Sequence, residues 1–222
     1  MEFRGGTVNR TEKDPKSLHQ VTGAKWLHAG DVAQVRSYPF SSIHLLTKGC
    51  FMGAGTFAYA SNSNRFLACE PLQHQPFALA GIPFDGAVTN RPGARFGPQE
   101  IRRASLMLCD GLHPFFGVTP IDVLGDAGEF ALPNASPLVN VRSAIEAQAD
   151  ALLAQHHCVF LGGDHSVTLP LLRAIKRRHG AVALIHFDAH CDTWEDHFGE
   201  PSGHGTWTYE ALQEGLVQPE KT

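Results

Sequence analysis

The chain has 222 residues, of which 43% are hydrophobic and 18% are charged, a balance that suits one globular α/β domain with a sizeable core. The formal net charge of −4 comes without a basic cluster, which argues against nucleic acid and against an anionic membrane surface as partners. A mild acidic excess is compatible with a small cationic substrate.

Cysteine usage and the N-terminus both favour a cytoplasmic protein. The five cysteines are odd in number and widely spaced, and they include no C-x-x-C pair. The N-terminus lacks the basic-then-apolar order of a signal peptide. The most apolar early stretch, residues 43–60, contains Lys48 and three glycines, so we expect no membrane-spanning helix there.

Residues 1–72 show no sustained helical or strand periodicity, and we expect them to form a poorly defined N-terminal extension. This extension is either a loosely packed or disordered segment, or a specific binding arm. Residues 73–222 are expected to form the folded domain.

Predicted strands and helices alternate through the folded domain. Apolar runs ended by Gly or Pro predict strands, and apolar residues at helical spacing predict helices. Pro98 suits the first turn of a helix, because its missing N–H would have no helical partner there. In chain order the predicted elements are strand 77–83, helix 98–104, strand 121–124, a helix that begins at 136–137, strand 158–161, helix 167–179 and strand 181–187.

This alternation predicts a three-layer α/β fold with a doubly wound parallel sheet. The 181–187 strand contains few polar residues, as expected when helices cover both faces of a sheet. In such folds ligands bind beyond the carboxyl ends of the strands. The turn-rich loop 89–98 lies at one of these ends, where Arg91 and Arg95 either meet an anion or hydrogen-bond loop carbonyl groups.

Charged side chains follow two of the predicted strands directly. His165 comes after strand 158–161, and Asp188, His190 and Asp192 come after strand 181–187. Residues two apart in an extended segment point to the same side, so the last three can converge. Mixed carboxylate and imidazole groups suit Mn, Fe or Zn, and two carboxylates can bridge a pair of ions. We expect these four residues to bind metal; the alternative is a satisfied polar cluster without metal.

Other residues near these clusters have predicted supporting roles. His204, between two glycines, is the candidate general acid or base, because imidazole titrates at a pH of about 6.5. Asp164 is expected to orient a ligand imidazole or a loop amide. We expect His186 to be a hydrogen-bonded core residue and Cys191 to point away from the ligands. Three acidic residues form either a rim that attracts a cation or a solvated loop: Glu195, Asp196 and Glu200.

Between Phe77 and Pro219 the chain resembles the ureohydrolase family of arginase, agmatinase, guanidinobutyrase and guanidinopropionase. The matching stretches are N-R-P-G-A-R-F-G-P, L-G-G-D-H-S, H-F-D-A-H-C-D-T and G-H-G-T. Details around Cys191 and Gly203 favour the agmatinase and guanidino-acid branch. The resemblance therefore implies an arginase-like fold, a homo-oligomer, and hydrolysis of a linear guanidino compound, such as agmatine or a guanidino acid.

The resemblance also implies a cofactor and roles for the candidate residues. Two Mn²⁺ ions would be bound, one by His165, Asp188 and Asp192 and the other by Asp188 and His190. A metal-bridging hydroxide would attack the guanidinium carbon, giving urea and an amine, and His204 would assist the proton transfers.

One departure from the family pattern bears on activity. The family carries a later pair of aspartates separated by one residue, which complete both metal sites, whereas no two aspartates in this sequence stand two apart. We therefore expect a domain that is C-terminally incomplete and corresponds to the N-terminal two thirds of a ureohydrolase. The alternative function is a non-catalytic fragment that binds metal weakly or associates with full-length subunits.

Overall fold

The computed structural model describes residues 64–222, in which three parallel strands form a sheet of order β2-β1-β3. The central strand β1 (Phe77–Ile82) is almost wholly buried, and it pairs with β2 (Leu124–Glu129) on one side and β3 (His157–Gly162) on the other. Phe77 lies opposite both Leu124 and His157, so the two flanking strands begin level with each other. Their carboxyl ends consequently meet at one edge of the sheet.

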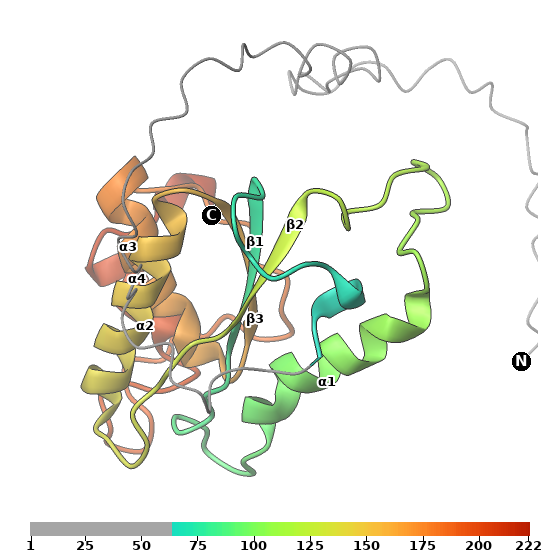
Figure 1. Cartoon of the computed structure of the whole chain (residues 1–222). Coiled ribbons are helices and arrows are strands. Elements are labelled where there is room, and N and C mark those ends of the chain that lie inside the picture. Colours follow the sequence, from blue (N-terminus) through green and yellow to red (C-terminus); the bar gives the residue numbers. More distant parts are fainter. Residues whose placement is uncertain (1–63) are drawn as a thin grey trace, which may run out of the picture. The chain divides into compact units, whose positions relative to one another are not determined.

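Helices cover both faces of this sheet, with α1 on one face and α2, α3 and α4 on the other (Figure 1). The helices are α1 (Gly97–Ser105), α2 (Leu138–Leu153), α3 (Thr168–His179) and α4 (Trp207–Gln213). Short 3-10 turns occupy Phe66–Ala68, Ala94–Phe96, Leu106–Leu108, His165–Val167 and Pro219–Lys221. This arrangement confirms the predicted α/β fold with a parallel sheet between helical layers.

Two apolar cores hold the helices on their shared face. In one of them Val141, Ile145 and Ala149 of α2 pack against Ala80 and Ile82 of β1. The other core joins α3 to α4 and consists of Leu169, Leu172, Trp207, Ala211, Leu216 and Val217. Burial of the second set of side chains supplies the main driving force that fixes α4, and with it the turn that precedes α4, against α3.

Most predicted elements agree with the structure, but the predicted strand 121–124 was placed too early. β2 runs from Leu124 to Glu129, and its centre contains Asp126, which is 5% exposed. The pair Gly125-Asp126 is typical of a turn, so the sequence pattern ends the strand before Gly125. The buried charge is tolerated because a distant arginine pairs with it.

The prediction of a strand at residues 181–187 is wrong, because no such strand forms among the described residues. Val182 forms a β-bridge to Val217, and the rest of the segment has no strand partner. Val182 and Leu184 pack towards α3 and α4, while Ile185 and Phe187 on the opposite side are 80% and 93% exposed. The alternation is therefore that of an extended segment covered on one side, and not that of a strand buried on both.

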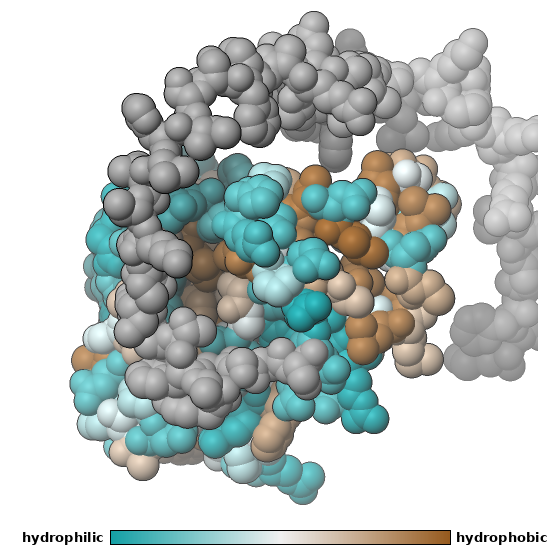
Figure 2. All heavy atoms as spheres, in the orientation of Figure 1, coloured by the Kyte–Doolittle hydropathy of each residue, from teal (hydrophilic) through white to brown (hydrophobic). Residues whose placement is uncertain are grey.

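The surface carries a second group of exposed apolar side chains, after α1. Leu106, Met107, Phe115, Phe116 and Val118 are between 45% and 89% exposed. Figure 2 shows apolar residues gathered over the region of α1 and the loop that follows it. No helix within residues 64–222 is both long enough and apolar enough to cross a membrane.

Residues 64–72, which the sequence analysis assigns to the extension, pack on the domain. Leu67 and Cys69 are buried, and Pro71 forms a bridge with Asp126. The predictions for residues 1–63 lie outside the described residues.

A fully buried ion pair joins α1 to the sheet. Arg102 Nε lies 2.8 Å from one carboxylate oxygen of Asp126, and Arg102 Nη2 lies 2.9 Å from the other. The same Nη2 also donates to the carbonyl oxygen of Gly128 at 2.8 Å. This bidentate contact satisfies the charge that β2 carries at its centre.

We predict that Arg102→Leu lowers the free energy of unfolding by about 3–5 kcal/mol, because it leaves the Asp126 carboxylate buried without its cation. Urea unfolding followed by circular dichroism measures this loss. The matched control is Arg103→Leu in the next position of α1, where the side chain is exposed and the expected change is about 0.5 kcal/mol or less. Equal losses for the two variants would contradict the prediction.

Candidate metal centre

Three of the four predicted ligands lie together beyond the carboxyl end of β3. His165 Nδ1 is 2.7 Å from Asp192 Oδ2 and 3.2 Å from Asp188 Oδ2. His165 and Asp192 are half-buried, and Asp188 lies at the surface. The two segments that were expected to meet at this edge of the sheet do meet there.

The turn that positions His165 depends on close packing between the ends of β1 and β3. Gly163 N donates to Ile82 O and Asp164 N donates to Phe84 O. A Cβ at Gly163 would come within 2.2 Å of the carbonyl oxygen of Phe84, so only glycine fits at this position. His165 then begins a 3-10 turn that leads into α3.

Asp164 orients a loop amide, one of its two predicted roles. Its carboxylate accepts hydrogen bonds from the backbone N–H of Ala87 at 2.9 Å and from that of Ser166 at 2.9 Å. The Asp164 side chain therefore links the loop after β1 to the turn that carries His165.

Trp207, at the start of α4, holds both Asp192 and the imidazoles beside it. Its Nε1 donates to Asp192 Oδ2 at 2.7 Å, and the residue is 1% exposed. Its ring centroid lies 4.7 Å from that of His165 and 5.1 Å from that of His186. No local sequence pattern marks Trp207, because its contact with Asp192 arises only from the packing of α4 against α3.

The fourth predicted ligand, His190, does not join this group. Its side chain is 81% exposed, and its Nδ1 lies 3.3 Å from the Oδ1 atom of Asp188. A bend at residues 189–190 and the left-handed backbone of Asp192 (φ 52°) break the extended alternation on which the prediction depended. Asp192 is turned back towards His165, whereas His190 faces solvent.

His186 lies beside His165, Asp188 and Asp192. It offers one ligand atom, as do His165, Asp188 and Asp192, and these four atoms all lie within 4.8 Å of one another. The expected hydrogen-bonded core role is wrong, because His186 Nε2 is buried without a hydrogen-bond partner, 3.5 Å from Asp188 Oδ2. The signal that could have found it was present, since His186 stands two residues before Asp188 in an extended segment.

The Asp188 carboxylate is stabilised in its charged form. The backbone N–H of His190 donates to Oδ1 at 2.8 Å, and this hydrogen bond, with the nearby imidazole of His165, lowers the pKa of Asp188 from its usual value. A carboxylate that is ionised at neutral pH, beside two imidazoles and a second carboxylate, is a donor set that suits Mn, Fe or Zn. Together with the unpartnered Nε2 of His186, this donor set fits a bound divalent ion.

His204 lies in a neighbouring group formed with the loop after β1. Its Nε2 is 3.2 Å from Thr89 Oγ1, and its backbone N–H donates to Ala87 O. The ring centroid of His197 lies 4.7 Å from that of His204. Burial, and then the proximity of His204, lowers the pKa of His197. His204 is thus held by the loop that Asp164 also contacts, three residues before Trp207.

The remaining predicted residues are exposed. Cys191 lies at the surface and is a free thiol. Glu195, Asp196 and Glu200 are also exposed, and Asp196 accepts a hydrogen bond from Gly199 N. Their predicted role as an acidic rim stays a prediction.

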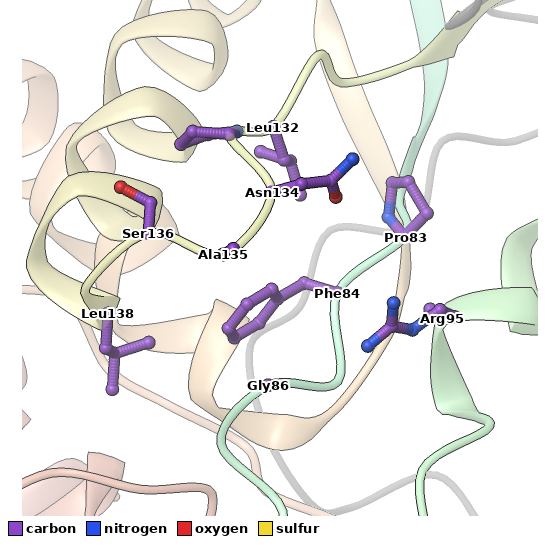
Figure 3. A pocket seen from close by; sticks show the side chains of 10 residues that line it. Pro83, Phe84, Gly86, Arg95, Leu132, Asn134, Ala135, Ser136 and Leu138 are labelled. Atoms are coloured by element: carbon purple, nitrogen blue, oxygen red, sulfur yellow. The ribbon is translucent and has the colours of Figure 1, made fainter.

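Arg95 does meet an anion, and that anion belongs to the protein. Its Nε donates to the buried carboxylate of Asp85 at 2.6 Å, and Gly93 N donates to the same carboxylate at 2.6 Å. Figure 3 shows Arg95 beside a pocket of about 320 Å³ at the ends of β1 and β2. None of the four clustered residues lines this pocket, so its lining contributes no group to the candidate metal centre.

Hydrogen bonds from Arg95 lower the pKa of Asp85 from 3.8 to about 2. A lowered pKa in the folded state stabilises the fold at pH values above the unfolded pKa, and this contribution is lost as the pH falls towards the folded pKa. We predict that Asp85→Asn lowers the free energy of unfolding by about 1–3 kcal/mol at pH 7. The difference from the unchanged protein should shrink between pH 4 and pH 2, the interval set by the two pKa values.

Urea unfolding at several pH values tests this prediction. The control is Asp122→Asn, which changes an exposed carboxylate. A stability difference for Asp85→Asn that stays constant down to pH 2 would rule out the carboxylate as its source.

Comparisons with known proteins point to one family. The Arginase family matches residues 75–222. The agmatinase of Chromobacterium violaceum is 44% identical over 149 residues, which are 65% of this chain and 46% of that protein. The guanidinobutyrase of Pseudomonas aeruginosa is 42% identical over 148 residues, which are 63% and 44% of the two chains. The chain thus spans about half the length of these curated relatives.

A solved structure gives the same result for the fold. The proclavaminate amidino hydrolase from Streptomyces clavuligerus superposes with a TM-score of 0.66 at 31% sequence identity. The superposition covers 73% of this chain and 55% of that one.

Proposed function

Because the chain belongs to the arginase family, we propose that it hydrolyses a linear guanidino compound, agmatine or a guanidino acid, to urea and an amine. The observation that carries this proposal is the convergence of His165 Nδ1 with carboxylate oxygens of Asp188 and Asp192, 3.2 and 2.7 Å away. Curated relatives named agmatinase and guanidinobutyrase support the substrate class. We also propose that the protein forms a homo-oligomer in the cytoplasm.

The proposed cofactor is Mn²⁺, since arginase-family enzymes typically use a dinuclear manganese centre. His165, Asp188 and Asp192 would hold it, because they combine imidazole and carboxylate donors at one sheet edge. When bound, the metal supplies Lewis acidity and lowers the pKa of water to about 7, which makes hydroxide available at neutral pH. The predicted two-ion arrangement would use His190 for the second ion, and it stays a prediction.

The chain's own residues would guide the proton that the reaction must move. Addition of the water oxygen to the guanidinium carbon and cleavage of the bond to the substituted nitrogen give urea and the amine. Both protons of the water end on that nitrogen, which leaves as the protonated amine, and His204 is the proposed carrier because imidazole exchanges protons near neutral pH. Thr89 Oγ1, 3.2 Å from His204 Nε2, would fix the orientation of this ring.

We predict that His165→Asn reduces the rate of urea release from agmatine or 4-guanidinobutyrate by at least about 100-fold, because a lost ligand should cost more than the 10–100-fold that follows loss of a residue supporting a ligand. A colorimetric urea assay with Mn²⁺ in excess measures the rate. The matched control is His179→Asn at the exposed end of α3, which should retain the full rate. Undiminished urea release by His165→Asn would exclude this residue from the machinery.

A second prediction separates proton transfer from metal binding. His204→Gln should lower kcat by about 10²- to 10⁴-fold while leaving the Mn²⁺ affinity within about twofold, because the ring lies outside the ligand group. Urea assays and calorimetric Mn²⁺ titration measure the two quantities. A parallel loss of metal affinity would instead make His204 a structural support of the metal centre.

The alternative function is a non-catalytic chain that binds metal weakly or associates with full-length subunits. It is motivated by the aspartate pattern, since no two aspartates in this sequence stand two apart. Metal binding without urea release by the purified chain would support this alternative.

A further inference from the structure

We propose that Thr206 and Glu210 are positioning residues for His204, the proposed proton carrier. This inference rests on the proposed function, because it concerns how the chain holds one residue of that site in place. Both residues act through the turn of residues 202–206, which carries His204 and leads into α4.

The hydroxyl group of Thr206 closes this turn from the inside. Thr206 is fully buried, and its Oγ1 accepts a hydrogen bond from Gly203 N at 2.8 Å across the turn. The same oxygen donates to Glu210 Oε1 at 2.7 Å. Since Gly203 and Thr206 flank the segment that holds His204, one side chain fixes both sides of that segment.

Glu210 anchors the turn to the rest of the domain. Besides the bond from Thr206, its carboxylate accepts a hydrogen bond from Ser202 Oγ at 2.8 Å, so it holds both ends of the turn. Arg142 of α2 donates to the two carboxylate oxygens at 2.7 and 3.1 Å and is 5% exposed. An ionised carboxylate only accepts hydrogen bonds, so both hydroxyl groups must point towards it. The turn is thus tied to α2 through a charge pair that is shielded from water.

The contacts of the His204 ring depend on the position of this turn. The His204 backbone N–H donates to Ala87 O, and its Nε2 lies 3.2 Å from Thr89 Oγ1. On another side the turn packs against His197, which is 6% exposed. A Cβ at Gly203 would come within 2.0 Å of His197 Nδ1, so a larger residue there would displace the His197 ring. A shift of the turn would therefore break the contact that orients the His204 imidazole.

Thr208 provides a comparison within the same segment. It is 7% exposed, and its Oγ1 is buried with no hydrogen-bond partner among residues 64–222. Replacement of this threonine by valine keeps the branched shape and removes a hydroxyl group that holds nothing in place. The same replacement at Thr206 removes the hydroxyl group that closes the turn. The two substitutions therefore differ in the hydrogen bonds that they remove.

The test compares three variants of the 222-residue chain in the urea assay. Thr206→Val should lower kcat for agmatine or 4-guanidinobutyrate by about 10- to 100-fold, because misplacement of a group by about 1 Å can cost about 100-fold. KM should stay within about threefold, since the loss falls on the transition state and not on substrate binding. Thr206→Ser restores the hydroxyl group and should keep the kcat of the unchanged chain. Thr208→Val is the matched control and should keep it too.

Chemical modification reports on His204 without turnover. Diethyl pyrocarbonate modifies accessible neutral imidazoles, and peptide mass spectrometry gives the rates for His204 and for the exposed His179 in one sample. In Thr206→Val the His204 ring loses its fixed contact with Thr89, so its rate should rise severalfold while the His179 rate is unchanged. Both rates should be unchanged in Thr208→Val. Far-ultraviolet circular dichroism checks the fold of each variant.

A second substitution tests the carboxylate and keeps the inference testable if Thr206→Val does not fold. Glu210→Gln replaces one carboxylate oxygen by an amide group that donates, so Arg142 or one hydroxyl group loses its acceptor. It should lower kcat and raise the His204 modification rate as Thr206→Val does. Because the two residues act as a unit, the double variant should lose no more than the larger single loss, whereas independent effects would multiply.

Equal kcat values and equal His204 modification rates in Thr206→Val and Thr208→Val would overturn the inference. A loss in Thr206→Ser as large as that in Thr206→Val would also overturn it, because the effect would then come from packing and not from the hydroxyl group. Absence of urea release by the unchanged chain would sink the proposed activity, and the modification rates would decide the inference alone. Urea release that none of these variants changes would sink the inference and leave the activity standing.

Discussion

The candidate centre depends on a contact between two segments that do not pair as strands. His165 is placed by the end of β3, whereas Asp188 and Asp192 belong to an extended segment whose only β-bridge, among the described residues, is that of Val182 with Val217. What brings the segments together is the apolar core of α3 and α4, which covers the Val182 and Leu184 side of the segment. Hydrophobic burial therefore aligns polar groups that would otherwise repel one another or remain solvated.

Three ion pairs attach the surrounding loops and helices to this frame. Arg102 ties α1 to the middle of β2, and Arg95 ties the loop after β1 to the buried Asp85. Arg142 of α2 reaches Glu210 of α4 at 2.7 Å. Burial raises the pKa of Glu210, but hydrogen bonds from Arg142 and Thr206 lower it further, so this pKa lies below its usual value. Each pair is partly or wholly shielded from water, so its contribution to the position of the loop or helix is larger than a surface pair would make.

How far the sequence predicts this structure depends on the range of the interactions involved. β1, β3, α1, α2 and α3 follow from local periodicity, whereas α4 has no counterpart among the predicted elements; His165, Asp188 and Asp192 follow from their places after apolar runs. The position of β2 could not be predicted, because the burial of Asp126 requires Arg102, 24 residues earlier. The separation of His190 from Asp192 follows from the bend at residues 189–190 and the left-handed backbone of Asp192, and no periodic pattern encodes these conformations.

A bound ion would have a consequence for the stability of the segment that carries Asp188 and Asp192. Ile185 and Phe187 are almost fully exposed, so packing on their side of the segment contributes little to holding it in place. The four clustered donors come from residues 165 to 192, and an ion held among them would join the end of β3 to a stretch whose one strand contact is the bridge at Val182. Because a ligand that binds only the folded state stabilises it by mass action, the ion would act on this stretch as a cross-link. In that case metal binding and the ordering of residues 185–192 would be one event, and the affinity of the centre would include the free energy of ordering that stretch.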